Sequence, residues 1–431
     1  MSASPAEETI LDLYHAALAA VEPAAAVRSH FCREGRELVL DDRRIPVHGR
    51  LLMVGAGKAA VRMARGVEAI CGELIDGGLV ITKDGCATGE LPSRVAVREA
   101  SHPIPDQRGV AATRELLELV SEAGPDDVVL AIISGGGSAL LEAPRPPVTL
   151  EEMARVTDLL LRAGAPIEDL NAVRIPLSVI KGGGLRRAAG EANVVTLILS
   201  DVLGNDPRII ASGPTVPGAA TGERALDVLS RYGVLEQTPE SVRVVLSEAM
   251  QSDPIGTSQD ALVIVGGNEA AIVAAERRAR ARGFAPMVAW RAKTGEASML
   301  GRDWVDLLPR VPEDVDVVLG GGEATVTVRG DGVGGRNTEF ALAAAIALHE
   351  AKMTDWTVAS LATDGDDGLA GAAGAIASED TAERARSLGV DLGKALHDND
   401  SGRFFAAVGG LVRPGPTGTN VNDLYFAVRR R

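Results

Sequence analysis

Seven short, largely apolar runs constrain the fold more than any other feature of the sequence. They are continuous rather than alternating, and they lie at residues 50–54, 78–82, 128–133, 194–200, 261–265, 315–320 and 357–363. A continuous run of this length indicates a strand buried on both faces, as in a parallel sheet covered by helices. Helical patterns lie between several runs, at residues 59–70, 109–123, 150–163 and 269–282. This alternation predicts doubly wound α/β units.

The chain is too long for one ordinary core, because it has 431 residues. We expect a Rossmann-like doubly wound N-terminal domain over residues 1–250 and a smaller α/β C-terminal domain over residues 251–431. The boundary is placed at the polar stretch 251–260, which breaks the periodicity. In the second domain, the alternating segment 324–330 predicts a strand with some antiparallel pairing.

Charge and terminal sequence limit the class of protein. The net charge of −15 disfavours non-specific binding to nucleic acid or to an anionic membrane. Residues 1–23 read as an acidic amphipathic helix, not a signal peptide, and no uncharged apolar run approaches the roughly 18 residues of a membrane span. The three cysteines lack metal-ligand spacing. We therefore expect a cytoplasmic protein, and the sequence leaves homodimer formation open.

A triple-glycine turn follows the buried run 128–133. In open α/β sheets, ligands bind beyond the carboxyl ends of strands, where a turn without side chains lets backbone amides approach an anion. We expect a helix to begin near Ser138 and to attract that anion. A tight turn that needs positive φ is the alternative. The predicted phosphate-binding residues are Ser134, Gly135, Gly136, Gly137 and Ser138.

A second bare turn, Gly55–Lys58, follows the run 50–54. It formally matches the dinucleotide fingerprint G-x-G-x-x-A, but the strand at 78–82 runs into Lys83 instead of the acidic residue that would hold a ribose. Lys58 would place an ammonium where an anion would lie. We predict that Lys58 is a point charge for a phosphate or carboxylate, since a helix N-terminus otherwise disfavours cations.

Further polar residues follow strands or flank glycines. Lys181 precedes the triple glycine that begins at Gly182, which fits a phosphate-facing segment and, equally well, a helix that ends in a glycine cap. Asp201 ends a buried strand and is a candidate Mg²⁺ ligand or base, with capping as the alternative. Asn205 follows in the same loop.

The C-terminal third repeats this chemistry. Glu323 follows a third triple glycine, which we predict to be a turn, and Arg336 precedes a helix that Asn337 or Thr338 could cap. Asp364 follows a buried strand, where metal contact and a solvated acidic turn are both open. Together the turns predict a cleft for a polyphosphate, a divalent cation and a small anion. Phosphoryl transfer is the reaction class that uses all three.

Several segments together resemble the type-II glycerate kinases, whose C-terminal part is called the MOFRL domain (about 315–428 here). They are SHPIPDQRG, ISGGGSALL, LNAVRIPLSVIKGGGL, LSDVLGNDPRIIASGPTVP, GGGEATVTVRGDGVGGRNTEFAL and NDSGRFFAAVGGLVRPGPTGTNVNDL. The resemblance implies ATP- and Mg²⁺-dependent phosphorylation of D-glycerate at its 2-hydroxyl, giving 2-phosphoglycerate, in a cleft between the domains.

Residue roles follow from the resemblance and the motifs together. The family's catalytic Lys and Arg fall on Lys58 and Arg336. Asp201 is a third catalytic candidate, and Asp201 and Asp364 are the candidate metal ligands. Lys181, Gly182 and Asn205 join the phosphate-binding turn, and the expected substrate-binding residues are Gly57, Arg174, Glu323 and Asn337. We assign His102 to turn geometry.

Two positions depart from the family pattern. Ile175–Pro176 stands where relatives often carry Lys-His, and Gly371 stands where they often carry Asp. These departures leave open a kinase for another small hydroxy acid. Two different functions also stay open on the sequence: an NAD(P)H-dependent hydroxypyruvate reductase and a non-catalytic nucleotide sensor.

Overall fold

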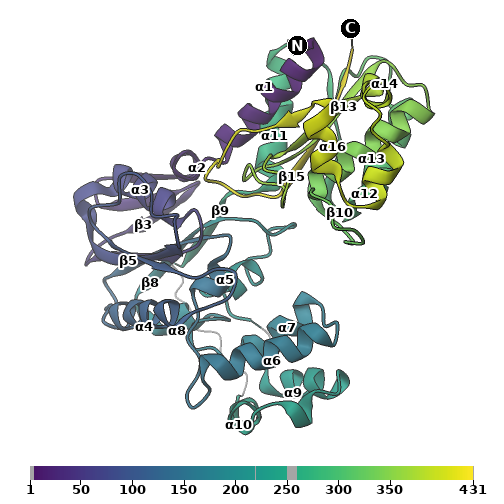
Figure 1. Ribbon diagram of the computed structural model, residues 1–431. Coiled ribbons are helices and arrows are strands. Elements are labelled where there is room, and N and C mark those ends of the chain that lie inside the picture. Colours follow the sequence, from purple (N-terminus) through teal and green to yellow (C-terminus); the bar gives the residue numbers. More distant parts are fainter. Residues whose placement is uncertain (1–3, 219, 250–259, 431) are drawn as a thin grey trace. The chain divides into compact units, whose positions relative to one another are not determined.

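The chain forms two compact units. A computed structural model describes residues 4–218, 220–249 and 260–430 (Figure 1). One unit comprises Met1–Glu22 and Gly266–Arg431, and the other comprises Pro23–Val265. The expected boundary at residues 250 and 251 lies outside the described residues. The observed division differs from the expected one chiefly at the N-terminus, where the first helix belongs with the C-terminal residues.

The Pro23–Val265 unit is built on a doubly wound sheet. Its strands are β4 (Leu51–Ala56), β5 (Ile75–Lys83), β6 (Ala96–Ala100), β7 (Val128–Ser134), β8 (Asn193–Leu199) and β9 (Ala261–Gly266). Their order is β6-β5-β4-β7-β8-β9, and the β4–β5, β4–β7, β5–β6 and β7–β8 pairs are parallel. Numbered along the chain, this is the 3-2-1-4-5-6 order of dinucleotide-binding folds, so the predicted fold class is confirmed.

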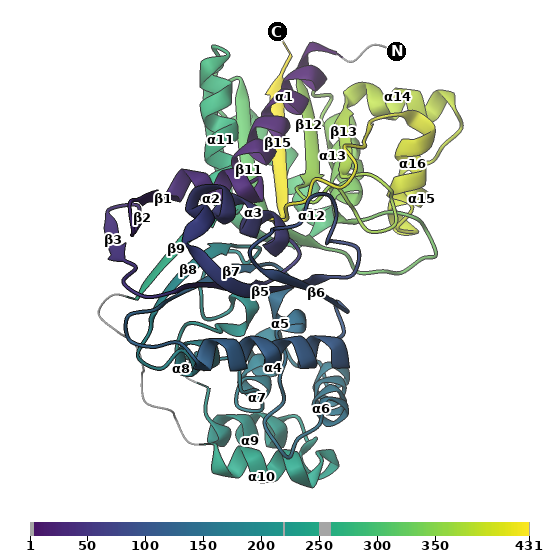
Figure 2. The same cartoon turned by 90° about the vertical axis from the view of Figure 1, so that its left-hand side faces the viewer.

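Helices cover both faces of this sheet. Helices α3 (Ala60–Cys71) and α4 (Gln107–Ser121) lie on opposite sides of it (Figure 2). A separate apolar cluster joins α6 (Leu150–Arg162), α7 (Ile167–Arg174), α9 (Gly222–Arg231) and α10 (Glu240–Glu248). The remaining elements are α2 (Pro23–His30), α5 (Gly137–Leu140), α8 (Gly184–Ala188) and an antiparallel sheet of β1 (Phe31–Glu34), β2 (Glu37–Leu40) and β3 (Arg43–Pro46).

The other unit contains a mixed sheet of order β10-β11-β15-β12-β13-β14. These strands are β10 (Pro286–Glu296), β11 (Val317–Thr325), β12 (Trp356–Ala362), β13 (Gly374–Ser378), β14 (Leu411–Val412) and β15 (Asp423–Arg429). Only β10 and β11 pair in parallel. Helices α1 (Pro5–Ala20) and α11 (Asn268–Ala281) lie on one face, and α12 (Ala297–Leu307) and α13 (Arg336–Glu350) on the other (Figure 1). Helices α14 (Glu379–Ser387), α15 (Leu392–His397) and α16 (Ser401–Val408) complete the unit.

Packing explains why α1 joins this unit. Its apolar face, which includes Ile10, Leu13 and Tyr14, is fully buried. Asp12 accepts hydrogen bonds from Arg278 of α11, and the Tyr14 hydroxyl donates to the Ala362 carbonyl at 2.7 Å. Among the described helices, no single one is long and apolar enough to cross a membrane; α1 and α2 reach that length only as a bent pair.

The third triple glycine is not a turn. Gly320, Gly321 and Gly322 lie inside β11, and the alternating strand expected at residues 324–330 ends at Thr325. A Cβ on Gly321 would overlap the Asn268 side chain, and one on Gly322 would overlap the Lys293 carbonyl of β10. The glycines are therefore needed for close packing around a buried strand, not for a reversal of the chain.

We predict that Gly322→Ala lowers the free energy of unfolding of this unit by at least about 2 kcal/mol, because a backbone carbonyl occupies the space of the new methyl group. All three tryptophans, Trp290, Trp304 and Trp356, lie in this unit, so their fluorescence during urea unfolding measures it. Gly393→Ala, at an exposed site of α15 with ordinary contacts, is the control and should be neutral or mildly stabilising. Equal stability of both variants would contradict the explanation.

Candidate functional site

Two glycine-rich turns, at residues 55–58 and 135–138, meet where the strand order of the sheet reverses. The turns after β4 and β7 emerge from adjacent strands at the point from which the sheet is wound in opposite directions. The Lys58 amide donates to the Gly135 carbonyl at 2.9 Å, and the Ala59 amide donates to Ser134 Oγ at 3.1 Å. In open α/β sheets this switch point is where ligands bind, so the geometry marks a candidate site within the Pro23–Val265 unit.

Three successive backbone amides of the second turn have no acceptor among the described residues. Within the described part of the chain, the N–H groups of Gly136, Gly137 and Ser138 donate no hydrogen bond to another residue. Gly136 is left-handed, with φ of 81°. Consecutive N–H groups in such a turn form a nest that binds anions. The expected helix after Ser138 is only the four-residue α5, so the anion site depends on the nest and not on a helix dipole.

Two side chains lie next to Gly136 of the nest. A Cβ built on Gly136 would lie 3.0 Å from His102 Cδ2 and 3.3 Å from Lys58 Cγ. Among the residues that the structure describes, none forms a hydrogen bond or an ion pair with the Lys58 ammonium. Burial and the cations of Lys58 and Lys83 lower the pKa of His102 to about 4. The nest therefore lies beside a cationic side chain and a neutral imidazole. His102 lies in a bend of the chain, as expected, and the expectation did not include its position beside Gly136.

A carboxylate and a strained loop complete the surroundings of the nest. A Cβ on Gly135 would overlap the Asp201 carboxylate, which places this group against the turn. Ala211 and Ser212 have φ of 49° and 60°, values that L-residues rarely adopt, and Ser212 Oγ lies 2.8 Å from Ser138 Oγ. Strained residues of this kind cluster at functional sites. Asn205, also left-handed at 55°, lies in the loop after β8.

Some expected phosphate-binding groups are already bonded inside the protein. The Lys181 ammonium is fully buried and donates to the carbonyls of Ser138 at 2.6 Å and Leu141 at 3.0 Å. It also pairs with Glu142 at 3.2 Å, so its three protons have partners. The Gly182 amide donates to the Ser212 carbonyl, and Ser134 Oγ is buried beneath the turns. These residues support the nest instead of presenting free donors to a ligand.

Two residues with an expected substrate role are also internal contacts. Arg174 Nη2 lies 3.8 Å from Oε2 of Glu142, and the same carboxylate forms an ion pair with Lys181. Gly57 lies so close to Ser134 that a Cβ would overlap its hydroxyl, and the Gly57 carbonyl accepts from the Thr82 hydroxyl. Gly57 therefore permits the approach of the two turns.

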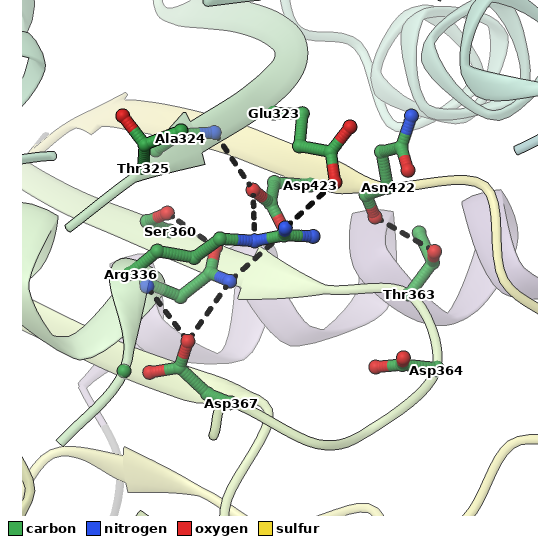
Figure 3. Close-up of polar contacts among 12 residues, drawn as sticks. Glu323, Ala324, Thr325, Arg336, Ser360, Thr363, Asp364, Asp367, Asn422 and Asp423 are labelled. Carbon is green, nitrogen blue, oxygen red and sulfur yellow. Dashed lines mark hydrogen bonds and ion pairs between the residues drawn. The ribbon is translucent and has the colours of Figure 1, made fainter. Parts of the chain in front are cut away.

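The other unit holds a second polar cluster, around Arg336 at the start of α13 (Figure 3). Arg336 Nε donates to Oδ1 of the fully buried Asp423 at 3.1 Å and lies 2.8 Å from its Oδ2, and Nη1 donates to Glu323 at 2.8 Å. Within the described residues, Nη2 donates no hydrogen bond. Burial raises the pKa of Asp423 to about 7, and the Arg336 guanidinium opposes that shift. Arg336 is thus held in place by two carboxylates, and its two Nη2 hydrogens have no acceptor among the described residues.

The cap of α13 comes from a distant residue. Asp367 accepts from the backbone amides of Asn337 and Thr338, each at 2.8 Å, and from the Thr338 hydroxyl. Thr338 also takes part in the cap, as expected, because its hydroxyl accepts from the amide of the N-cap residue Gly335 at 2.9 Å. The buried Asn337 side chain donates to Asp367 and Asp423 and accepts from Ser360, so it positions the cluster and has no group left for a substrate.

Asp364 lies apart from this cluster (Figure 3). Its Oδ1 accepts from the Asp366 amide at 3.1 Å. Among the described residues, no group of three or more His, Cys, Asp or Glu side chains could hold a metal ion. Single carboxylates can still complete the shell of a cation that a phosphate brings.

We predict that the His102 imidazole titrates near pH 4 in a ¹³C- or ¹⁵N-edited NMR experiment, well below an ordinary histidine. Replacing Lys58 by Met should raise that pKa, because a neighbouring cation is removed. Since the folded pKa is depressed, His102 adds stability as pH rises from about 4 to 6.5. The variant His102→Gln assigns the resonance, and an ordinary midpoint unaffected by Lys58→Met would refute this arrangement.

Asp367→Ala should lower the free energy of unfolding of its unit by more than about 2 kcal/mol. It removes a buried helix cap and leaves several buried hydrogen-bond donors without an acceptor. The matched control is Asp391→Ala, which removes the exposed cap of α15 and should cost about 1 kcal/mol or less. Tryptophan fluorescence in urea measures both. Equal losses would show that the Asp367 contacts add nothing beyond an ordinary cap.

Comparison with known proteins assigns the family. Residues 9–247 match the family model described as a domain of unknown function, DUF4147, and residues 316–423 match the MOFRL family, close to the expected region. A D-glycerate 2-kinase from Thermotoga maritima is 39% identical over 88% of this chain and 90% of its own length. A protein from Agrobacterium vitis that carries a hydroxypyruvate reductase name is also 39% identical, over 97% of this chain and 93% of its own.

A solved structure agrees with these relatives. The crystal structure of a glycerate kinase from Thermotoga maritima superposes with a TM-score of 0.88 at 35% identity, and covers 98% of this chain and 99% of that one. Both halves of the sequence and the fold thus have the same relatives. The chain belongs to the family of DUF4147 and MOFRL proteins that includes these glycerate kinases.

Proposed function

We propose that the protein transfers the terminal phosphoryl group of ATP, with Mg²⁺, to the 2-hydroxyl of D-glycerate and forms 2-phosphoglycerate. The names of the relatives suggest the substrate. One observation carries the reaction class: at the switch point of the sheet, an anion-binding nest lies beside the Lys58 side chain, whose ammonium has no ion pair among the described residues. Phosphoryl transfer needs such donors and cations to stabilise the transferring group.

The chain's own residues divide the work as follows. The amides of Gly136, Gly137 and Ser138 bind phosphate oxygens, and Lys58 neutralises charge that develops on the transferring phosphoryl group. Asp201, against the nest, is placed to accept the hydroxyl proton or to complete a magnesium shell. For Arg336 we propose the glycerate carboxylate as partner, because its planar fork suits carboxylate oxygens and Nη2 donates to none of the described residues.

The described residues fit a nucleotide-borne magnesium ion better than a resident one. Mg²⁺ in phosphoryl-transfer enzymes is usually held by one or two carboxylates and by substrate phosphates, with water in the remaining positions. Asp201 supplies a carboxylate next to the nest, and no cage of three acidic or imidazole ligands exists in the described part of the chain. When bound, the ion would neutralise phosphate charge.

The reductase alternative is less well supported, although the strand order is that of dinucleotide-binding folds. A dinucleotide site needs an acidic residue at the end of the second strand to hold the ribose. Here β5 ends at Lys83, and the following Asp84 is paired with Arg108 through two hydrogen bonds at 2.7 and 2.8 Å. The Lys58 side chain also lies beside an anion-binding turn, where it suits phosphate neutralisation.

Replacing Lys58 by Met should lower kcat for ADP release at least about 100-fold, because a cation at the transferring group is lost. Thermal unfolding should be almost unchanged, since the ammonium has no partner among the described residues. Lys394→Met, on the exposed α15, is the control and should keep wild-type activity.

The assay measures ADP release with and without D-glycerate and Mg²⁺, and ³¹P NMR identifies the phosphorylated hydroxyl. Dependence on both components and a 2-phosphate product are expected. Wild-type turnover by the Lys58→Met variant would remove the proposed role of Lys58. NADH oxidation with hydroxypyruvate, in the absence of glycerate-dependent ADP release, would replace the kinase by the reductase.

A further inference from the structure

His102 approaches the nest from a third loop of the Pro23–Val265 unit. It lies between β6 and α4, whereas Lys58 follows β4 and the nest follows β7. A Cβ built on Gly136 would lie 3.0 Å from His102 Cδ2 and 3.1 Å from His102 Nε2. The imidazole therefore turns the edge that carries Nε2 toward the left-handed glycine of the nest.

The distance between Nε2 and the nest suits a shared anion. The Gly136 amide nitrogen is two covalent bonds from that Cβ position, and each bond is about 1.5 Å long. Nε2 consequently lies no more than about 6 Å from this nitrogen. A hydrogen bond from a nitrogen donor to an oxygen spans about 2.9 Å. Two donors at this separation can therefore bind the same phosphate group, each through one of its oxygens.

The imidazole has hydrogen-bonding capacity that the protein does not use. Among the described residues, none forms a hydrogen bond or an ion pair with either ring nitrogen of His102. Burial and the cations of Lys58 and Lys83 lower the pKa of His102 to about 4, so the ring is neutral at physiological pH. A neutral imidazole carries one N–H donor. That donor can bind a phosphate oxygen without adding a second positive charge beside Lys58.

The loop that carries His102 is anchored at both ends. Ala100, the last residue of β6, accepts a backbone hydrogen bond through its carbonyl at 3.0 Å. Asp106 caps α4 by accepting from a backbone amide at 2.9 Å. The Thr113 hydroxyl of α4 donates to the Leu140 carbonyl of α5 at 3.4 Å, so this helix contacts the end of the nest segment. The imidazole is thus positioned before a ligand arrives, which lowers the entropic cost of binding.

We propose that His102 is a phosphate-binding residue whose Nε2–H donates to an oxygen of the phosphate held by the nest amides. Loops after β4, β6 and β7 then contribute an ammonium, an imidazole and three amides to one anion site. The inference rests on the proposed function for the identity of that phosphate as part of ATP. The contact itself requires only a phosphate chain at the nest, so the two can be tested separately.

Isothermal titration calorimetry of the full chain tests the contact with two probes, a non-hydrolysable ATP analogue with Mg²⁺ and inorganic pyrophosphate. His102→Leu removes the donor and should weaken both affinities about 10-fold or more, because a hydrogen bond to a charged group is lost. His102→Gln should restore most of that affinity, since its amide N–H extends to the place of Nε2–H. His102→Asn, whose shorter amide corresponds to Nδ1, should not.

His48→Leu is the matched control for these variants. His48 is exposed and precedes the amino end of β4, whereas the nest lies beyond the carboxyl ends of the strands. The control variant should bind both probes as wild type does. Thermal unfolding of His102→Leu should match wild type as well, because the imidazole has no hydrogen bond to lose among the described residues.

NMR spectroscopy of the imidazole gives a readout that a merely structural role would not move. Pyrophosphate at the nest should raise the pKa of His102 above its value of about 4, because a neighbouring anion stabilises the protonated ring. Pyrophosphate should also shift the Nε2 resonance more than the Nδ1 resonance. An imidazole that only shapes the loop would show neither change.

The proposal is overturned if His102→Leu binds each probe as wild type does, if His102→Gln restores no affinity, or if wild type binds neither probe. Weakened pyrophosphate binding by His102→Leu, in a protein without glycerate-dependent ADP release, would support the contact and reject the kinase reaction. Glycerate-dependent ADP release by wild type, together with unchanged binding by His102→Leu, would reject the contact alone.

Discussion

The hydrogen bond from the Lys58 amide to the Gly135 carbonyl is the contact on which the candidate site depends. It joins the turn after β4 to the turn after β7 at 2.9 Å, and the Ala59 amide reinforces it through Ser134 Oγ. Such close approach of two backbones leaves no room for side chains. A Cβ on Gly57 would overlap Ser134, so Gly57 allows the two turns to meet. Gly135 instead makes room for Asp201 of the loop after β8. The meeting of the turns places the Lys58 side chain beside the nest.

Around this contact the protein separates positioning from binding. Lys181 and Glu142 are buried and form an ion pair, and the Lys181 ammonium donates to the Ser138 carbonyl. These charges stabilise the turn and are not exposed on its surface. The Arg336 cluster follows the same principle in the other unit, because Asn337, Asp367 and Asp423 are buried and bonded to one another while the arginine keeps an available edge. Charges held in this way are already oriented before a ligand arrives, which is how an enzyme avoids reorganisation during the reaction.

Much of the fold was predictable because buried parallel strands leave a strong mark in the sequence. All seven predicted strands exist, and the helical patterns at residues 59–70 and 109–123 correspond to α3 and α4. The predicted turn at Gly320–Gly322 failed because a glycine needed for close packing and a glycine needed for a turn look alike in one sequence. The contact of α1 with α11 also could not be read, since local pattern does not say which distant surface covers a helix.

The glycine-rich turns of the candidate site were predictable from the sequence. The residues that position these turns were harder to predict. Lys58 and the residues from Gly135 to Ser138 follow strands and could be found by position alone. His102 and Asp367 act through contacts with residues 34 and 29 positions away. Nothing near them in the sequence indicates those contacts. The buried state of Lys181 and Asn337 was likewise hidden, because a polar residue beside glycines is compatible with both a binding role and a supporting one.

The central claim is that the nest amides and the Lys58 ammonium at the switch point hold the phosphoryl group that is transferred. A crystal structure with Mg²⁺ and a non-hydrolysable ATP analogue tests it most directly. We expect oxygens of the terminal phosphate within hydrogen-bonding distance of the Gly136, Gly137 and Ser138 amides and of Lys58 Nζ. A well-ordered nucleotide bound elsewhere, with these amides contacting only solvent, would contradict the account.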